Sequence, residues 1–71
     1  MNKKNNLKVI ETFNLAVQNH KKNNYQTAKH LYLKTLNLDP KFVNAHYNLG
    51  NLLHILGEYI NAIKSFKKAI E

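Results

Sequence analysis

The segment that decides the fold is residues 48–69, NLGNLLHILGEYINAIKSFKKA, because it repeats the pattern of residues 14–35, NLAVQNHKKNNYQTAKHLYLKT. The same landmarks recur 34 positions apart, pairing Asn14 with Asn48, Ala16 with Gly50, Tyr25 with Tyr59, Ala28 with Ala62 and Tyr32 with Phe66. A fixed period of this size predicts a stacked array of repeats. Such arrays present long surfaces, so the period favours binding over catalysis.

Composition narrows the class of protein. The chain has 71 residues, no cysteine and a net charge of +7 in which every cation is a lysine. This length predicts one small domain, and the lack of cysteine excludes disulfides and thiolate metal sites. The charge favours acidic partners. Without arginine or a separate aromatic platform, nucleic-acid binding is the weaker alternative.

The start of the chain is basic and polar. Residues 1–6 could resemble the start of a signal peptide, but Lys8 and Glu11 interrupt the apolar stretch that follows. No run of about 18 apolar residues is present to cross a membrane. The sequence therefore predicts a cytoplasmic protein.

Four helices are predicted, at residues 7–22, 25–38, 42–56 and 59–71. Asn23-Asn24 and Gly57 can supply the left-handed turns that end the first and third helices. Asp39-Pro40 ends the second, because proline lacks an amide proton. At helical spacing, the expected packing residues are Thr12, Leu15, Ala16, Asn19, Ala28, Leu31, Tyr32, Thr35, Leu36, His46, Leu49, Gly50, Leu53, Ala62, Ile63, Phe66, Ala69 and Ile70.

This pattern resembles the tetratricopeptide repeat: a small residue in the first helix, an aromatic that opens the second, then a small–aromatic–small pattern and a closing proline. The resemblance implies an all-α fold, a right-handed α-solenoid of two antiparallel helix hairpins. It divides the chain into a frayed basic segment (1–8), a first repeat (9–42) and an incomplete second repeat (43–71). Thr12 and His46 stand where the family often has tryptophan, and Thr35 replaces a small alanine.

The last helix ends without a terminator or a polar capping helix. Ile63, Phe66 and Ile70 would then lack the first helix of a following unit, although terminal units of solenoids normally carry a polar outer face. We therefore expect either the N-terminal part of a longer array or self-association through these residues.

In the tetratricopeptide family, the first helices of successive units line a concave surface that binds extended peptides or partner helices. The corresponding candidate residues here are Asn14, Val17, His20, Lys21, Asn44, Tyr47, Asn48, Asn51, His54 and Ile55, with Ile10 and Phe13 on the same stripe. Asn14 and Asn48 could each bond a peptide backbone through the side-chain amide, or could simply be solvated. For Phe13 and Tyr47, packing against a neighbouring unit is favoured over ligand contact.

Other site chemistries find little support. His20 and His54 would be about 10 Å apart in a stacked array, too far to share a metal ion. Lys29, Lys34, Lys64, Lys67 and Lys68 are expected on a solvated convex side, whereas Lys21 could meet an acidic ligand group. The family's carboxylate clamp spans three units, so a complete clamp is not expected in two.

No catalytic constellation, glycine-rich phosphate loop or cofactor site is found in the sequence. The sequence therefore predicts a non-enzymatic module for protein–protein interaction. The alternative is a substrate-docking arm of a larger transferase whose catalytic domain lies beyond Glu71, as in bacterial proteins with similar repeats.

Overall fold

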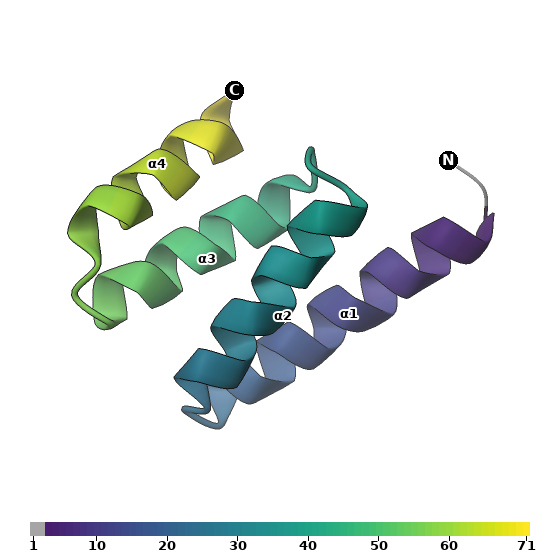
Figure 1. The fold of residues 1–71 in the computed structure, drawn as a ribbon, viewed down its shortest axis with the longest axis horizontal. Helices are drawn as coiled ribbons and strands as arrows, with labels where there is room; N and C mark the ends of the chain where they lie inside the picture. The colour runs from purple at the N-terminus through teal and green to yellow at the C-terminus, as the bar shows by residue number, and fades with distance from the viewer. Residues whose placement is uncertain (1–2) are drawn as a thin grey trace.

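The computed structural model describes residues 3–71 and confirms the all-α class (Figure 1). Its helices are α1 (Lys3–Lys21), α2 (Tyr25–Leu38), α3 (Val43–Ile55) and α4 (Tyr59–Ile70). They form two antiparallel hairpins, α1–α2 and α3–α4, and no strand occurs within residues 3–71. The bounds of α2 agree with the sequence prediction, those of α3 differ from it by one residue at each end, and those of α4 by one residue at the C-terminal end.

Helix α1 begins earlier than expected. The sequence predicts a start at Leu7 after a frayed segment 1–8, but the backbone is helical from Lys3. No proline or glycine lies between these positions, so nothing stops the helix from propagating towards the N-terminus. Met1 and Asn2, which belong to the expected frayed segment, lie outside the described residues.

The two hairpins turn in the same way. Asn23 in the first hairpin and Gly57 in the second have positive φ, of 64° and 80°. The next residue donates its backbone N–H to a carbonyl five positions back, from Asn24 to Asn19 at 2.9 Å and from Glu58 to Leu53 at 2.8 Å. This is the Schellman arrangement that satisfies the free carbonyls of a helix end. The sequence prediction of left-handed turns at these positions is confirmed.

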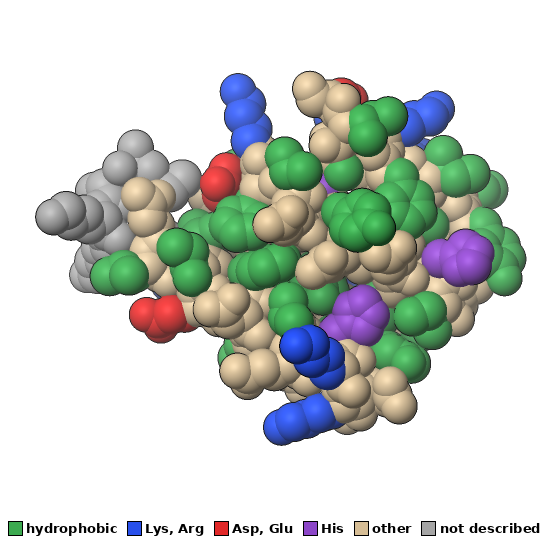
Figure 2. All heavy atoms as spheres, turned by 180° about the vertical axis from the view of Figure 1, so that it is seen from behind, with side chains coloured by type: hydrophobic (Ala, Val, Ile, Leu, Met, Phe, Trp, Pro, Cys, Tyr) green, Lys and Arg blue, Asp and Glu red, His purple; other side chains and the backbone are tan. Residues whose placement is uncertain are grey.

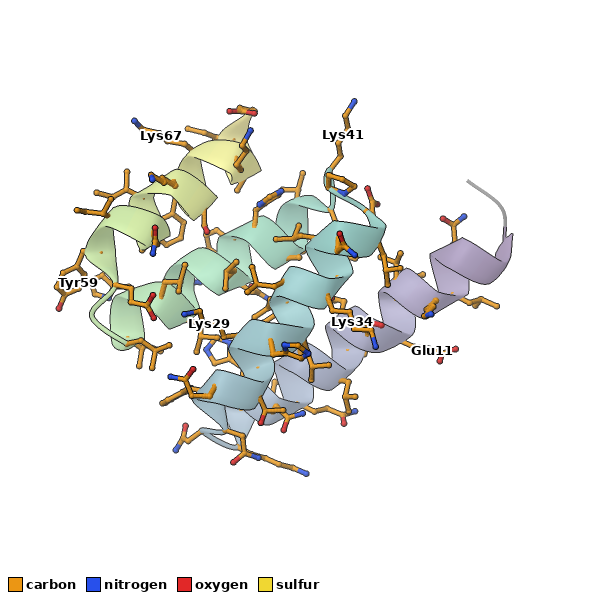
Figure 3. All side chains as sticks on the ribbon, viewed as in Figure 1. Glu11, Lys29, Lys34, Lys41, Tyr59 and Lys67 are labelled. Atoms are coloured by element: carbon orange, nitrogen blue, oxygen red, sulfur yellow. The ribbon has the colours of Figure 1, made fainter. Side chains whose placement is uncertain are left out.

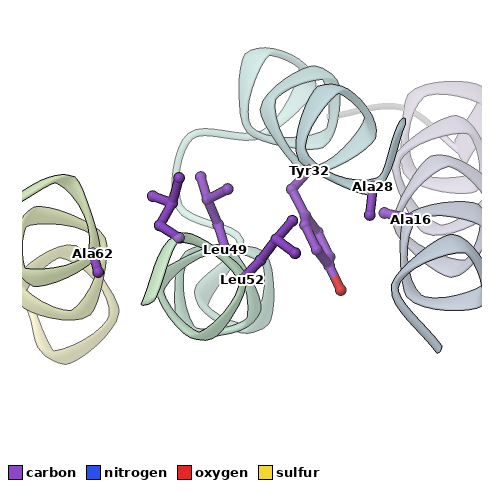
Figure 4. Close-up of a cluster of buried hydrophobic side chains, with 7 residues drawn as sticks. Ala16, Ala28, Tyr32, Leu49, Leu52 and Ala62 are labelled. Atoms are coloured by element: carbon purple, nitrogen blue, oxygen red, sulfur yellow. The ribbon is translucent and has the colours of Figure 1, made fainter. Parts of the chain in front are cut away.

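The helices form two layers in a thin slab with extents of 36 × 28 × 13 Å. In Figure 1, α2 and α4 lie in front, with α1 and α3 behind them. Helix α3 packs against both α2 and α4, so it joins the two hairpins. One cluster of buried residues runs through all four helices and contains Ala16, Ala28, Tyr32, Leu49, Leu52, Leu53 and Ala62 (Figure 4).

The small residues in this cluster allow close helix contact. A Cβ atom on Gly50 would lie 2.6 Å from Cε1 of Phe66, well inside van der Waals contact. Phe66 is therefore half-buried against α3, as expected for a packing residue, and the sequence analysis expects only the helix of a following unit to be missing beside it. Thr35 is buried at a position where the tetratricopeptide pattern has a small alanine. Its hydroxyl group donates a hydrogen bond to the Leu31 carbonyl oxygen at 2.8 Å, so the buried hydroxyl has a partner.

The prediction of which residues pack between helices is wrong at some positions. Leu15 is 48% exposed, whereas its counterpart Leu49 is 4% exposed. Leu49 and Leu52 join the cluster that contains Tyr32 of α2, the helix packed on this side of α3. No helix within residues 3–71 covers the corresponding side of α1, where Leu15 and the exposed Gln18 lie. Leu52 is fully buried but was not predicted.

Two more packing predictions fail, both on α4. Ile63 and Ile70 are exposed, because no described helix covers the outer side of α4. The sequence analysis anticipates this exposure for a chain without a following unit. The right-handed sense of the superhelix stays a prediction.

Candidate protein-interaction face

The predicted site residues lie on α1 and α3 and, by helical spacing, share one face of each helix. They come from α1 and α3, the layer behind α2 and α4, and we call this side the α1–α3 face. Figure 2 looks at the molecule from behind and shows hydrophobic side chains gathered here, with histidines among them. The α1–α3 face consists of Asn14, Val17, His20 and Lys21 of α1 and Asn44, Tyr47, Asn48, Asn51, His54 and Ile55 of α3.

Access to solvent differs among these residues. The exposed ones are Asn14, Lys21, Asn44, Tyr47, His54 and Ile55, and the half-buried ones are Val17, His20, Asn48 and Asn51. Tyr47 and Ile55 are 53% and 54% exposed, so two large apolar side chains face solvent about two turns apart on α3. The face thus combines apolar contact area with side-chain amides.

A hydrogen-bond group centred on Tyr32 lies beneath this face. The Tyr32 hydroxyl oxygen is 2.9 Å from Nδ1 of His20, and the side chain of Asn48 also hydrogen-bonds it. Burial raises the pKa of Tyr32, and the bond from Asn48 acts in the opposite direction, as expected when an amide N–H donates to the oxygen. The hydroxyl proton is then free to bond the unprotonated Nδ1 of a neutral His20.

The protonation of His20 fits this arrangement. Burial lowers the pKa of His20, because the charged imidazolium loses hydration between the helices. His20 also packs edge-to-face on Tyr25, with the ring centroids 6.0 Å apart. His20 therefore has a structural role in the first hairpin, in addition to lying at the border of the face.

Asn14 and Asn48 are not equivalent in the structure. Asn48 is half-buried and bonded to Tyr32, because α2 packs against its side of α3. Asn14 is exposed, and no described helix packs against the same side of α1. The sequence analysis did not identify the Tyr32 hydroxyl as a hydrogen-bonding group. A signal was present in the sequence, because the repeat position that holds Tyr32 in the first unit holds Phe66, which has no hydroxyl, in the second.

The aromatic residues on the face and on the predicted stripe differ in how much of each ring is exposed. Phe13, on the predicted stripe, packs against Phe42 and Tyr32 at centroid distances of 4.9 and 6.1 Å, which confirms the packing interpretation. Tyr47 packs against Phe66 at 5.9 Å but keeps its other side exposed. Val17 packs against the buried cluster, so less of it is available to a ligand than of Tyr47.

The histidines do not come together. His20 lies against Tyr25, and His54 lies against Tyr59 at a centroid distance of 5.2 Å. Within the described part of the chain, no group of three or more His, Cys, Asp or Glu side chains could hold a metal ion. None of the helices in residues 3–71 is both long and apolar enough to cross a membrane.

Among the lysines whose side chains the structure describes, Lys21 belongs to the α1–α3 face. Lys29 of α2 pairs with Glu58 at the start of α4, with Nζ 3.0 Å from Oε2 (Figure 3). Lys34, Lys64 and Lys67 are exposed on the α2–α4 side, as the sequence predicts.

Residues 31–64 match the tetratricopeptide repeat family, a segment that covers the second half of α2, all of α3 and the first half of α4. No curated protein matches the chain. The match and the four-helix arrangement together support a tetratricopeptide-like repeat.

Proposed function

We propose that this chain, which carries a tetratricopeptide-type repeat, binds an extended peptide or a partner helix on its α1–α3 face. Proteins with such repeats generally mediate protein–protein interaction. The observation that carries the proposal is the solvent exposure of Tyr47 and Ile55 beside the amides of Asn44 and Asn51. Large apolar side chains on a folded surface supply contact energy, and amides can bond a peptide backbone in both directions.

The structure changes the proposed roles of the two asparagines. Asn14 is free to bond a ligand, because its amide is exposed. Asn48 already hydrogen-bonds the Tyr32 hydroxyl, so we assign it a role in holding α3 against α2 rather than in binding the peptide backbone. Lys21, exposed about two turns from Asn14 along α1, would meet an acidic group of the ligand.

The test begins with selection of binders from a random peptide display library against the whole chain. The dissociation constants of the selected peptides are then measured with Tyr47→Ala, Asn14→Ala and the control Lys34→Ala, which lies on α2. Tyr47→Ala should weaken binding by about 2 kcal/mol or more, as for an aromatic anchor, and Asn14→Ala by about 1 kcal/mol. Peptides that bind both variants as tightly as the wild type would refute this site.

The two ends of the helix stack suggest a place in a larger assembly. Exposed Glu11 and Gln18 on α1 stand where buried Ala45 and Leu52 stand on α3. In contrast, Ile60, Ile63 and Ile70 are exposed on α4. A polar outer face is typical of a terminal repeat. We therefore propose that α1 caps an array and that the outer side of α4 takes a further repeat or a second copy of the chain.

Sedimentation equilibrium tests the second-copy version. Wild-type protein should associate with rising concentration, and Ile63→Glu should shift it towards the monomer, because the charge would be buried at the interface. The matched control is Glu11→Gln on α1, which should leave the association unchanged. A monomer at every concentration would exclude self-association through α4.

A further inference from the structure

We propose that the groove between α2 and α4 is a second docking surface, for an acidic amphipathic helix of a partner protein. It lies on the opposite side of the slab from the α1–α3 face. We call it the α2–α4 groove and define it by an apolar floor and a lysine rim: Leu33, Leu36, Leu49 and Leu53, with Lys29, Lys64, Lys67 and Lys68.

The groove is formed by adjoining clefts. One of about 430 Å³ is lined by Leu33, Leu36 and Leu49 below Lys64, Lys67 and Lys68. A neighbouring cleft of about 310 Å³ shares Leu33, Leu49 and Lys64 with it and extends to Leu53 and Lys29. In Figure 4, Leu49 projects from α3 towards the space between α2 and α4. The clefts follow α3, whose 13 residues span about 20 Å.

The floor offers apolar contact. Leu33 is 49% exposed on the wall formed by α2, while Leu49 is nearly buried at the bottom. Apolar side chains of a partner that covered Leu33 would gain burial without disturbing the core, because Leu49 and Leu53 are already packed there.

A helix suits this groove better than an extended peptide. The walls and floor are helices, whose backbone N–H and C=O groups bond within each helix. An extended peptide laid on leucines would lose water from its backbone groups and find few partners for them. A helix satisfies these groups internally, and helices pack at interaxial distances of about 8–10 Å.

The rim selects an acidic partner. Lys64 and Lys67 form no ion pair with any side chain that the structure describes, whereas Lys29 pairs with Glu58 and Lys68 with Glu71. At least two cations of the rim thus lack a counter-charge among the described side chains. Acidic residues that flank the apolar stripe of a docked helix would complement them.

The probe is a synthetic helix of about 14 residues, long enough to follow α3, with leucines along one stripe and glutamates elsewhere. Its dissociation constant for the whole chain is measured by calorimetry. Leu33→Asp should weaken binding about tenfold or more, since it places a charge in the apolar contact. The matched control is Leu15→Asp on α1, an equally exposed leucine outside the groove, which should bind the probe as the wild type does.

The charge requirement is tested separately. Lys64→Glu/Lys67→Glu should weaken binding and reduce its salt dependence, whereas Lys22→Glu/Lys34→Glu, with the same change in net charge, should have a much smaller effect. Tyr47→Ala on the α1–α3 face should leave the affinity unchanged, so this test does not depend on the peptide site.

Three outcomes would overturn the proposal. One is equal binding by Leu33→Asp and Leu15→Asp. Another is equal binding of a peptide with serines in place of the leucines, which would indicate charge attraction alone. The third is independent of any variant: in wild-type protein, the methyl signals of Leu33, Leu36 and Leu49 should shift when the probe binds, and unchanged signals would exclude the groove.

Discussion

Nδ1 of His20 in α1 lies 2.9 Å from the hydroxyl oxygen of Tyr32 in α2, a bond that has no counterpart in the second unit because phenylalanine replaces tyrosine there. The bond joins the two helices of the first hairpin near its turn. It also lies below Asn48, so it links the first hairpin to α3. The bond between His20 and Tyr32 therefore distinguishes the first unit from the second.

His20 should make stability depend on pH. Burial lowers its folded-state pKa below the ordinary value of 6.5, so folding favours the neutral ring. The contribution of His20 is then fully present above about pH 6.5 and is lost as the pH falls through the lower folded-state value. The difference in unfolding free energy between wild type and His20→Ala should therefore shrink below about pH 6.5.

Urea unfolding at several pH values measures this difference. His54→Ala is the matched control, because the side chain is exposed and packs on the corresponding tyrosine of the second unit. The interpretation fails if the difference for His20→Ala stays constant with pH or follows that for His54→Ala.

Gly50→Ala should destabilise the protein, although alanine favours helices over glycine. The added Cβ would lie within 3 Å of three ring atoms of Phe66. Overpacking of this kind costs about 1–3 kcal/mol, against a gain in helix propensity of about 1 kcal/mol. Thermal melts should show a lower melting temperature for Gly50→Ala. Phe66→Leu should recover part of the loss when combined with it, and additive losses would contradict the contact.

Gly57 should accept asparagine more readily than alanine. Its φ of 80° is left-handed, and the corresponding Asn23 already adopts 64°. No described atom outside residues 56–58 lies within 4 Å of the position where a Cβ would stand, so the difference is one of backbone conformation. Gly57→Ala should cost about 1 kcal/mol and Gly57→Asn less. Equal stabilities in urea would show that the turn can adopt another geometry.

The counterparts Leu15 and Leu49 should differ strongly in their response to truncation. Leu49→Ala should cost about 2–5 kcal/mol, because it leaves a cavity between α2 and α3. Leu15→Ala should cost well under 1 kcal/mol, because nearly half of the side chain is in water. Both values come from chemical unfolding, and similar losses would mean that the outer side of α1 is covered in solution.

The sequence by itself determined the helices, their turns and the pairing of the hairpins. The 34-residue period, Pro40 and the left-handed positions at Asn23 and Gly57 are local signals, because helix ends depend on nearby backbone geometry. Spacing also groups the candidate binding residues on one face of α1 and of α3, and their role in binding stays a prediction.

Only the tertiary structure decided which of two repeat-equivalent residues is covered. Leu15 and Leu49, or Asn14 and Asn48, occupy the same place in the repeat, but burial depends on whether a neighbouring helix lies beside them. The bond of Asn48 to Tyr32 and the α2–α4 groove likewise arise between helices of different units. Periodicity assigns a side chain to a face of its helix, and the packing of neighbouring helices determines whether that face meets protein or water.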